Sequence, residues 1–172
     1  PGGKDAERPL QDEATIRDNV AAAERQLKQV FKDDPFTLVN NLDWTQSMSV
    51  LEFLRDVGKY FGMSTLVQRD YIQKRIGEGG TGMSYTEFSY MLIQAYDFHH
   101  LRRDFNCELQ IGGSDQWGNI TAGMELIRRS TGADAHALTL QLLDRVGGTS
   151  FFDPSRGGEP ERPEPRHRGR GG

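Results

Sequence analysis

The chain reads CELQIGGSDQWGNI over residues 107–120. The apolar start, the paired glycines and Ser114, which can cap a following helix, predict a strand that turns directly into a helix. Such a corner presents backbone N–H groups and a helix N-terminus to an anion or a ribose. Asp115 and Gln116 add side-chain hydrogen-bonding groups at its mouth. Plain turn chemistry is the alternative interpretation, because glycine-rich corners are common.

Residues 84–98 predict a helix just upstream of this corner. Ser84 and Glu87 have the spacing of a capping box, in which each residue bonds the backbone N–H of the other. Most of the positions that follow are apolar and cover several sides of the helix axis, which is typical of a buried helix.

Three polar residues of this helix, Tyr90, Gln94 and Asp97, share one face because they are spaced i, i+4 and i+7. One interpretation is a solvated face. The other is a pocket, in which Asp97 accepts a hydrogen bond from a ligand hydroxyl while Tyr90 and Gln94 meet an ammonium group. A pocket of this kind disfavours an analogue without the hydroxyl, because its own polar groups then stay unpaired.

Two long runs, FSYMLIQAYDF (88–98) and LQIGGSDQWGNI (109–120), resemble the bacterial and organellar tyrosyl-tRNA synthetases, which are class I aminoacyl-tRNA synthetases. The similarity extends from the first residues to about Leu143. Shorter runs with the same resemblance are GKDAERPL (3–10), NNLDW (40–44) and FLRDVGKYF (53–61).

This resemblance implies a Rossmann-like α/β catalytic domain that activates L-tyrosine with ATP and transfers it to tRNA(Tyr). By the same resemblance Tyr90, Gln94 and Gln110 bind the ammonium group and backbone of tyrosine. Asp97 accepts the phenolic hydroxyl, and Gln116 lies near the tyrosine carboxylate and the α-phosphate.

Further roles follow from the resemblance for residues outside the tyrosine pocket. ATP is a substrate, with Mg²⁺ expected, and the intact enzyme is expected to be a homodimer with an aromatic contact at the position of Tyr85. The implied positions are Gly112 and Asp115 for the adenosine ribose, Lys4 and Arg8 for the departing pyrophosphate, and Trp117, Arg128 and Arg129 for the tRNA acceptor end.

The remaining pattern predicts a parallel α/β sheet, since helices alternate with short apolar strands. An amphipathic helix is expected from Asp12 to about Phe31 and a strand at Thr37–Asn41. The other expected elements are a helix capped by Ser47 or Ser49 and running through Phe61, a loop at 77–82, a helix at about 116–129 and a strand at about 137–142.

Two ATP-handling signatures of class I enzymes do not occur in the 172 residues: there is no His-x-Gly-His run, and no lysine follows Lys74. We therefore expect residues 1–143 to be part of a catalytic domain. Residues 144–172, rich in Gly, Pro, Arg and Glu, are expected to be disordered or aberrant. Arginines in this tail could touch RNA, but an out-of-frame or truncated gene end explains the composition better.

Composition narrows the remaining classes. The lone Cys107 indicates a buried thiol rather than a disulfide, no metal site is expected, and no long apolar stretch suggests a membrane span. A cytoplasmic or organelle-matrix location follows, and a net charge of −4 argues against indiscriminate nucleic-acid binding. Two alternatives remain open: a tryptophanyl-tRNA synthetase relative, and a module that binds tyrosine or RNA without making adenylate.

The missing signatures generate a first prediction. The purified 172-residue chain should make little or no tyrosyl-adenylate, because catalysis of phosphoryl chemistry depends on positioned positive charge around the phosphates. Tyrosine-dependent ATP–pyrophosphate exchange measures this directly. Robust exchange by the chain alone would show that the expectation is wrong.

Overall fold

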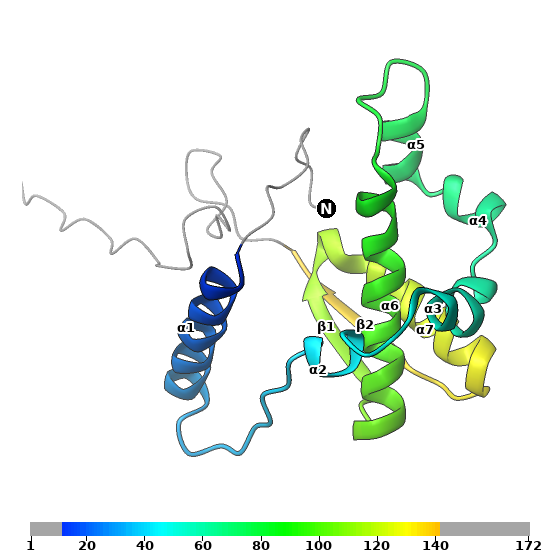
Figure 1. Cartoon of the computed structure of the whole chain (residues 1–172). Helices are drawn as coiled ribbons and strands as arrows, with labels where there is room; N and C mark the ends of the chain where they lie inside the picture. Colours follow the sequence, from blue (N-terminus) through cyan, green and yellow to red (C-terminus); the bar gives the residue numbers. More distant parts are fainter. Residues whose placement is uncertain (1–11, 142–172) are drawn as a thin grey trace, which may run out of the picture. The chain divides into compact units, whose positions relative to one another are not determined.

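The computed structural model describes residues 12–141. They belong to two compact units that divide between Leu38 and Val39, and each unit is described by itself (Figure 1). Lys4 and Arg8 lie outside the described residues, as do residues 144–172, for which a disordered tail was expected.

The first unit is built around helix α1 (Glu13–Phe31), as the amphipathic pattern predicts. Asp12 caps it by accepting a hydrogen bond from the backbone N–H of Thr15 at 2.7 Å. This bond lowers the pKa of the Asp12 carboxyl, since hydrogen bonds to the charged form favour it. No side chain of α1 is buried, so within its own unit the helix depends on capping and local pairs.

The second unit begins with short helices that lead to the central helix. Ser49 caps α3 in a complete capping box with Glu52, which confirms one of the two caps expected there. The short elements are α2 (Leu42–Thr45), α3 (Val50–Asp56), η1 (Gly58–Tyr60), α4 (Met63–Val67) and α5 (Asp70–Ile76).

Two sequence predictions are wrong in this region. Residues 37–41 do not form a strand. The side chain of Asn40 accepts a hydrogen bond from the backbone of Leu42, and the carbonyl of Asn41 accepts the Thr45 hydroxyl, so these residues lead into a helical turn. The helix expected to run through Phe61 ends instead at Asp56, and a separate 3-10 turn follows.

The central helix is α6 (Tyr85–Phe105), and its predicted capping box between Ser84 and Glu87 is present in both directions. Arg75 of α5 lies 3.2 Å from the same Glu87 carboxylate and ties the preceding helix to this start. The helix ends at Asn106, whose left-handed backbone (φ 54°) suits a helix C-terminus. Its buried residues are Met91, Leu92, Ala95, Tyr96 and Phe98.

A two-stranded parallel sheet and one connecting helix complete the unit. Strand β1 (Leu109–Gly113) pairs with β2 (His136–Leu140), with Leu109 opposite His136. The connection runs through the 3-10 turn η2 (Ser114–Gln116) and helix α7 (Trp117–Thr131). The α/β class and the parallel pairing predicted from the alternating elements are confirmed, with strand bounds displaced by one or two residues.

Helices α6 and α7 pack directly on each other at a glycine. A Cβ built on Gly123 of α7 would lie 2.9 Å from Phe98 Cδ1, closer than any real Cβ contact. Phe98 is fully buried together with Ile120 and Ile127 of α7. The absence of a side chain at Gly123 therefore lets the two helices approach each other.

This contact generates the second prediction. Gly123→Ala should lower the free energy of unfolding by about 1–3 kcal/mol, the usual cost of overpacking a filled core. The midpoint of urea unfolding, followed by far-UV circular dichroism, measures the change.

Gly118→Ala, in the same helix, is the matched control. Its added Cβ would meet its nearest neighbour, Arg69 Nη1, at an ordinary 3.6 Å. Alanine is the better helix former, so this variant should be neutral or slightly stabilised. Equal midpoints of urea unfolding for Gly123→Ala and Gly118→Ala would contradict the packing argument.

Candidate functional site

The carboxylate of Asp97 on α6 is held by two donors from the turn around α2. The Trp44 indole Nε1–H donates to Oδ1 at 2.8 Å, and the Asn41 amide Nδ2 donates to Oδ2 at 3.1 Å. Asp97 and Trp44 are both half-buried. Each carboxylate oxygen thus has a fixed neutral donor, which sets the orientation of the group without neutralising its charge.

A chain of amides connects α6 with the start of α7. Gln94 Nε2 and Asn119 Nδ2 both donate to Gln116 Oε1, each at 3.3 Å. Gln116 Nε2 in turn donates to Asp115 Oδ2 at 2.8 Å. The structure therefore brings together three of the predicted site residues, Gln94, Asp115 and Gln116, by direct side-chain contact.

Two other predicted tyrosine ligands have no such contact. Tyr90 is 47% exposed on the stripe of α6 that carries Gln94 and Asp97. Gln110 lies on β1, and within residues 12–141 its buried Oε1 has no hydrogen-bond partner. A buried acceptor without a donor costs free energy, so this oxygen has the chemistry expected of a ligand contact.

The corner after β1 differs in detail from the prediction. Ser114 does not cap a helix, since it lies inside η2 and neither N-cap residue there bonds through its side chain. Gly112 is required for close approach: a Cβ would lie 3.0 Å from both Gln116 Cβ and Ile120 Cδ1. The strand thus passes directly over the first turns of α7.

The residues predicted to approach tRNA lie along α7. Trp117 is 53% exposed at its start. Arg128 and Arg129 both pair with Glu125, and Arg129 Nη1 also donates to the Tyr60 carbonyl at 3.0 Å. These pairs lower the pKa of Glu125, because two guanidinium groups stabilise its charged form.

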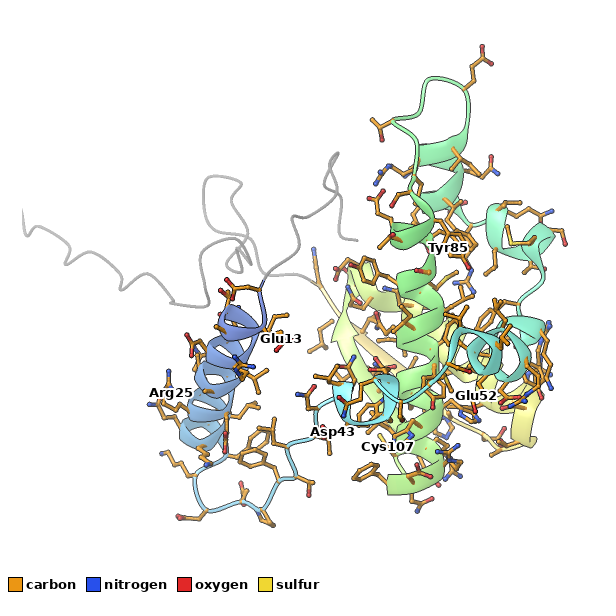
Figure 2. The ribbon with its side chains drawn as sticks, viewed as in Figure 1. Glu13, Arg25, Asp43, Glu52, Tyr85 and Cys107 are labelled. Atoms are coloured by element: carbon orange, nitrogen blue, oxygen red, sulfur yellow. The ribbon has the colours of Figure 1, made fainter. Side chains whose placement is uncertain are left out.

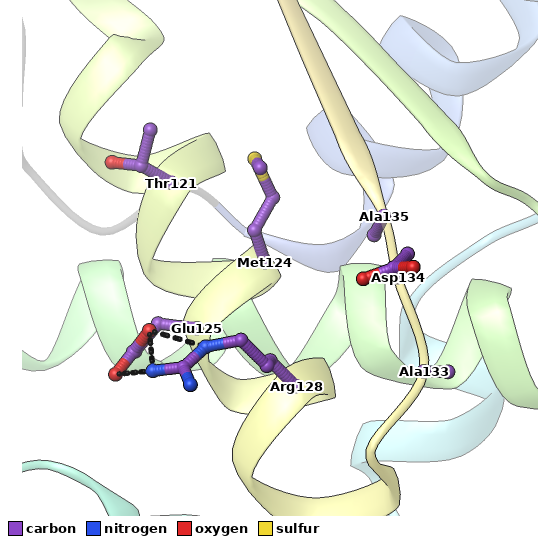
Figure 3. A pocket seen from close by; sticks show the side chains of 7 residues that line it. All are labelled: Thr121, Met124, Glu125, Arg128, Ala133, Asp134 and Ala135. Atoms are coloured by element: carbon purple, nitrogen blue, oxygen red, sulfur yellow. Dashed lines mark hydrogen bonds and ion pairs between the residues drawn. The ribbon is translucent and has the colours of Figure 1, made fainter.

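A shallow hollow of about 200 Å³ opens beside the same part of α7 (Figure 3). The hollow lies next to the start of β2, which is at the opposite edge of the parallel sheet from the end of β1. The contact between Gln94 and Gln116 is not part of it. The lining residues are Thr121, Met124, Glu125, Arg128, Ala133, Asp134 and Ala135.

Tyr85, expected at a dimer contact, is 73% exposed at the first turn of α6 (Figure 2). Across the described range 12–141, no group of three or more His, Cys, Asp or Glu side chains is arranged to hold a metal ion. Within that range, none of the helices has both the length and the hydropathy needed to cross a bilayer.

Sequence reasoning missed the side chains that hold the predicted residues. Asn41 and Trp44 were noted only as part of a resembling run, and Asn119 was given no role. The run Asn40–Trp44 contains an amide donor and an indole donor, and this pair is the signal that could have indicated partners for a carboxylate.

Comparisons with known proteins identify the family of the chain. The sequence model of the family described as "tRNA synthetases class I (W and Y)" matches residues 1–159. The tyrosine–tRNA ligases of Opitutus terrae and Bacillus velezensis are 45% and 48% identical over 96% and 88% of the chain. The chain spans 40% and 37% of the length of these two relatives.

Solved structures give the same result. A C-terminally truncated mitochondrial tyrosyl-tRNA synthetase from Coccidioides posadasii superposes with a TM-score of 0.66 and 27% identity, over 81% of this chain and 47% of that one. The corresponding enzyme structure from Aspergillus nidulans superposes with a TM-score of 0.62 and 26% identity, over 88% of this chain and 50% of that one. The chain therefore belongs to the family of class I tRNA synthetases that is described by the letters W and Y.

Proposed function

We propose that this chain forms the tyrosine-recognising part of a tyrosine–tRNA ligase, which activates L-tyrosine with ATP and transfers it to tRNA(Tyr). The observation that carries the proposal is the Asp97 carboxylate, fixed by Trp44 and Asn41. A carboxylate offers about four acceptor positions, so two donors leave capacity for a phenolic O–H. Phenylalanine brings no such donor, and its binding leaves this acceptor without a partner.

The amino-acid head group suits the amide cluster at the end of β1. Gln94 and Gln116 contact each other there, and Gln110 Oε1, which has no donor within the described part of the chain, is an acceptor for an ammonium N–H. Tyr90, on the same stripe of α6 as Asp97, would add a phenolic oxygen. These four residues, with Asp97, constitute the proposed tyrosine site.

ATP would lie at the corner that follows β1. The Gly112 backbone is a proposed contact of the ribose, and Asp115 supplies carboxylate oxygens for the ribose hydroxyls. Mg²⁺ would arrive with the ATP phosphates, where it balances their charge. Lys4 and Arg8 are proposed to steady the pyrophosphate as it leaves.

The remaining parts of the proposal concern partners and place. Trp117, Arg128 and Arg129 are proposed to meet the tRNA acceptor end, and Tyr85 to lie at a homodimer contact. The proposed location is the cytoplasm or an organelle matrix. Residues 1–143 would form the partial catalytic domain and residues 144–172 a tail outside it.

Asp97→Ala tests the tyrosine site and is the third prediction. Hydrogen bonds to charged groups contribute about 1.5–3 kcal/mol, so the preference for tyrosine over phenylalanine should fall roughly 10- to 100-fold. Equilibrium dialysis of both amino acids against the purified chain measures the two dissociation constants.

Asp43→Asn is the matched control, since Asp43 is an exposed carboxylate of α2 in the turn that supplies the donors. It should leave the preference unchanged. An unaltered preference in Asp97→Ala would remove Asp97 from the site. Tighter binding of tryptophan than of tyrosine by the native chain would instead support a tryptophanyl relative.

A further inference from the structure

His100 stacks on the indole that holds Asp97. The Trp44 and His100 ring centroids are 4.3 Å apart with an interplanar angle of 18°. We propose that His100 is a positioning residue, which keeps the Trp44 N–H directed at Asp97 and thereby sets the selectivity for a phenolic substrate. The selectivity part rests on the proposed function, whereas the positioning part stands on the geometry alone.

Trp44 needs such support because its own element is weak. Helix α2 has four residues and buries none of them. A helix this short is not stable by itself, so its side chains take their orientation from tertiary contacts. The indole is held at its edge by Asp97 and across its face by His100.

Helix geometry places both contacts side by side. Asp97 and His100 are spaced i and i+3 on α6 and therefore lie on one face, about one turn apart. The indole of Trp44 bridges the two, with its N–H on the carboxylate and its ring on the imidazole. One rigid helix thus carries both the acceptor and the surface that orients the donor.

The imidazole is itself anchored. His100 Nδ1 lies 3.1 Å from Asp104 Oδ2 and 3.2 Å from Arg103 Nη2. Either ring tautomer therefore has a partner: a protonated Nδ1 donates to the carboxylate, and an unprotonated Nδ1 accepts from the guanidinium. Arg103 also donates from Nε and Nη2 to the two carboxylate oxygens of Asp104, at 2.6 and 2.7 Å. The His100 side chain is only 13% exposed.

Two substitutions separate the stacking of the His100 ring from its Nδ1 anchor. His100→Phe keeps a flat ring for stacking but loses the Nδ1 anchor. His100→Asn keeps a polar group but loses the ring. Because parallel aromatic faces contribute to side-chain orientation beyond the area that they bury, the asparagine variant should release Trp44 and the phenylalanine variant should largely retain it.

The experiment follows the indole N–H itself, using the full chain labelled with ¹⁵N-tryptophan. The two tryptophans give two indole signals, and Trp117→Phe assigns them. Hydrogen exchange of the Trp44 Nε1–H should become about three- to tenfold faster in His100→Asn and should stay within about twofold of native in His100→Phe. The Trp117 signal reports within each sample that the second unit remains folded.

His136→Ala, at an exposed histidine on β2, is the control and should change neither signal. Unchanged exchange at Trp44 in His100→Asn would overturn the proposal. Equal acceleration in the asparagine and phenylalanine variants would also overturn it, since stacking would then not be the cause.

Tyrosine and phenylalanine dissociation constants measured on the same variants separate this inference from the proposed function. A parallel loss of preference in His100→Asn supports the whole proposal. A native chain that binds no tyrosine contradicts the proposed function, while the indole exchange still decides whether His100 positions Trp44. A preference that stays native although the indole is released would overturn the selectivity part.

Discussion

The contact of Phe98 with Gly123 is the constraint on which the second unit depends. Because Gly123 has no side chain, α7 lies directly on α6 and Phe98 is fully buried. The start of α7 follows β1 through a single 3-10 turn, so the same packing sets the distance between α6 and the end of the strand. The 3.3 Å contact between Gln94 and Gln116 is a direct result. A polar cluster is thus positioned by an apolar one.

Asp97 depends on a second, longer connection. Its two donors precede it by 53 and 56 residues and come from a turn with no buried residue of its own. The charge of Asp97 attracts the donors, and the stacking of Trp44 on His100 limits their movement. The two donors occupy one position on each carboxylate oxygen, so the group retains capacity to accept a further hydrogen bond.

Local chemistry explains which elements could be predicted. Ser84 caps a helix where its spacing from Glu87 indicated, and Ser49 is one of the two caps expected for α3, because capping depends on backbone groups two or three residues away. The errors occurred where a competing local turn replaces the expected element. Residues 37–41 have an apolar, β-branched pattern, but Asn40 and Asn41 bond into the turn before α2. Ser114 has the chemistry of a cap, yet η2 places it one turn before α7 begins.

From the sequence alone we could predict the family, the starts of α1, α3 and α6, the order of β1, α7 and β2, and the polar stripe of α6, since each depends on residues close together in the chain. Which stripe residues have partners depends on the tertiary structure. It gave Asp97 the Trp44 and Asn41 donors and joined Gln94 to Gln116, and among residues 12–141 it provides no donor for Gln110 Oε1. The physical reason is that these hydrogen bonds connect segments distant in the chain, and their lengths are set by how helices pack, which local spacing does not encode.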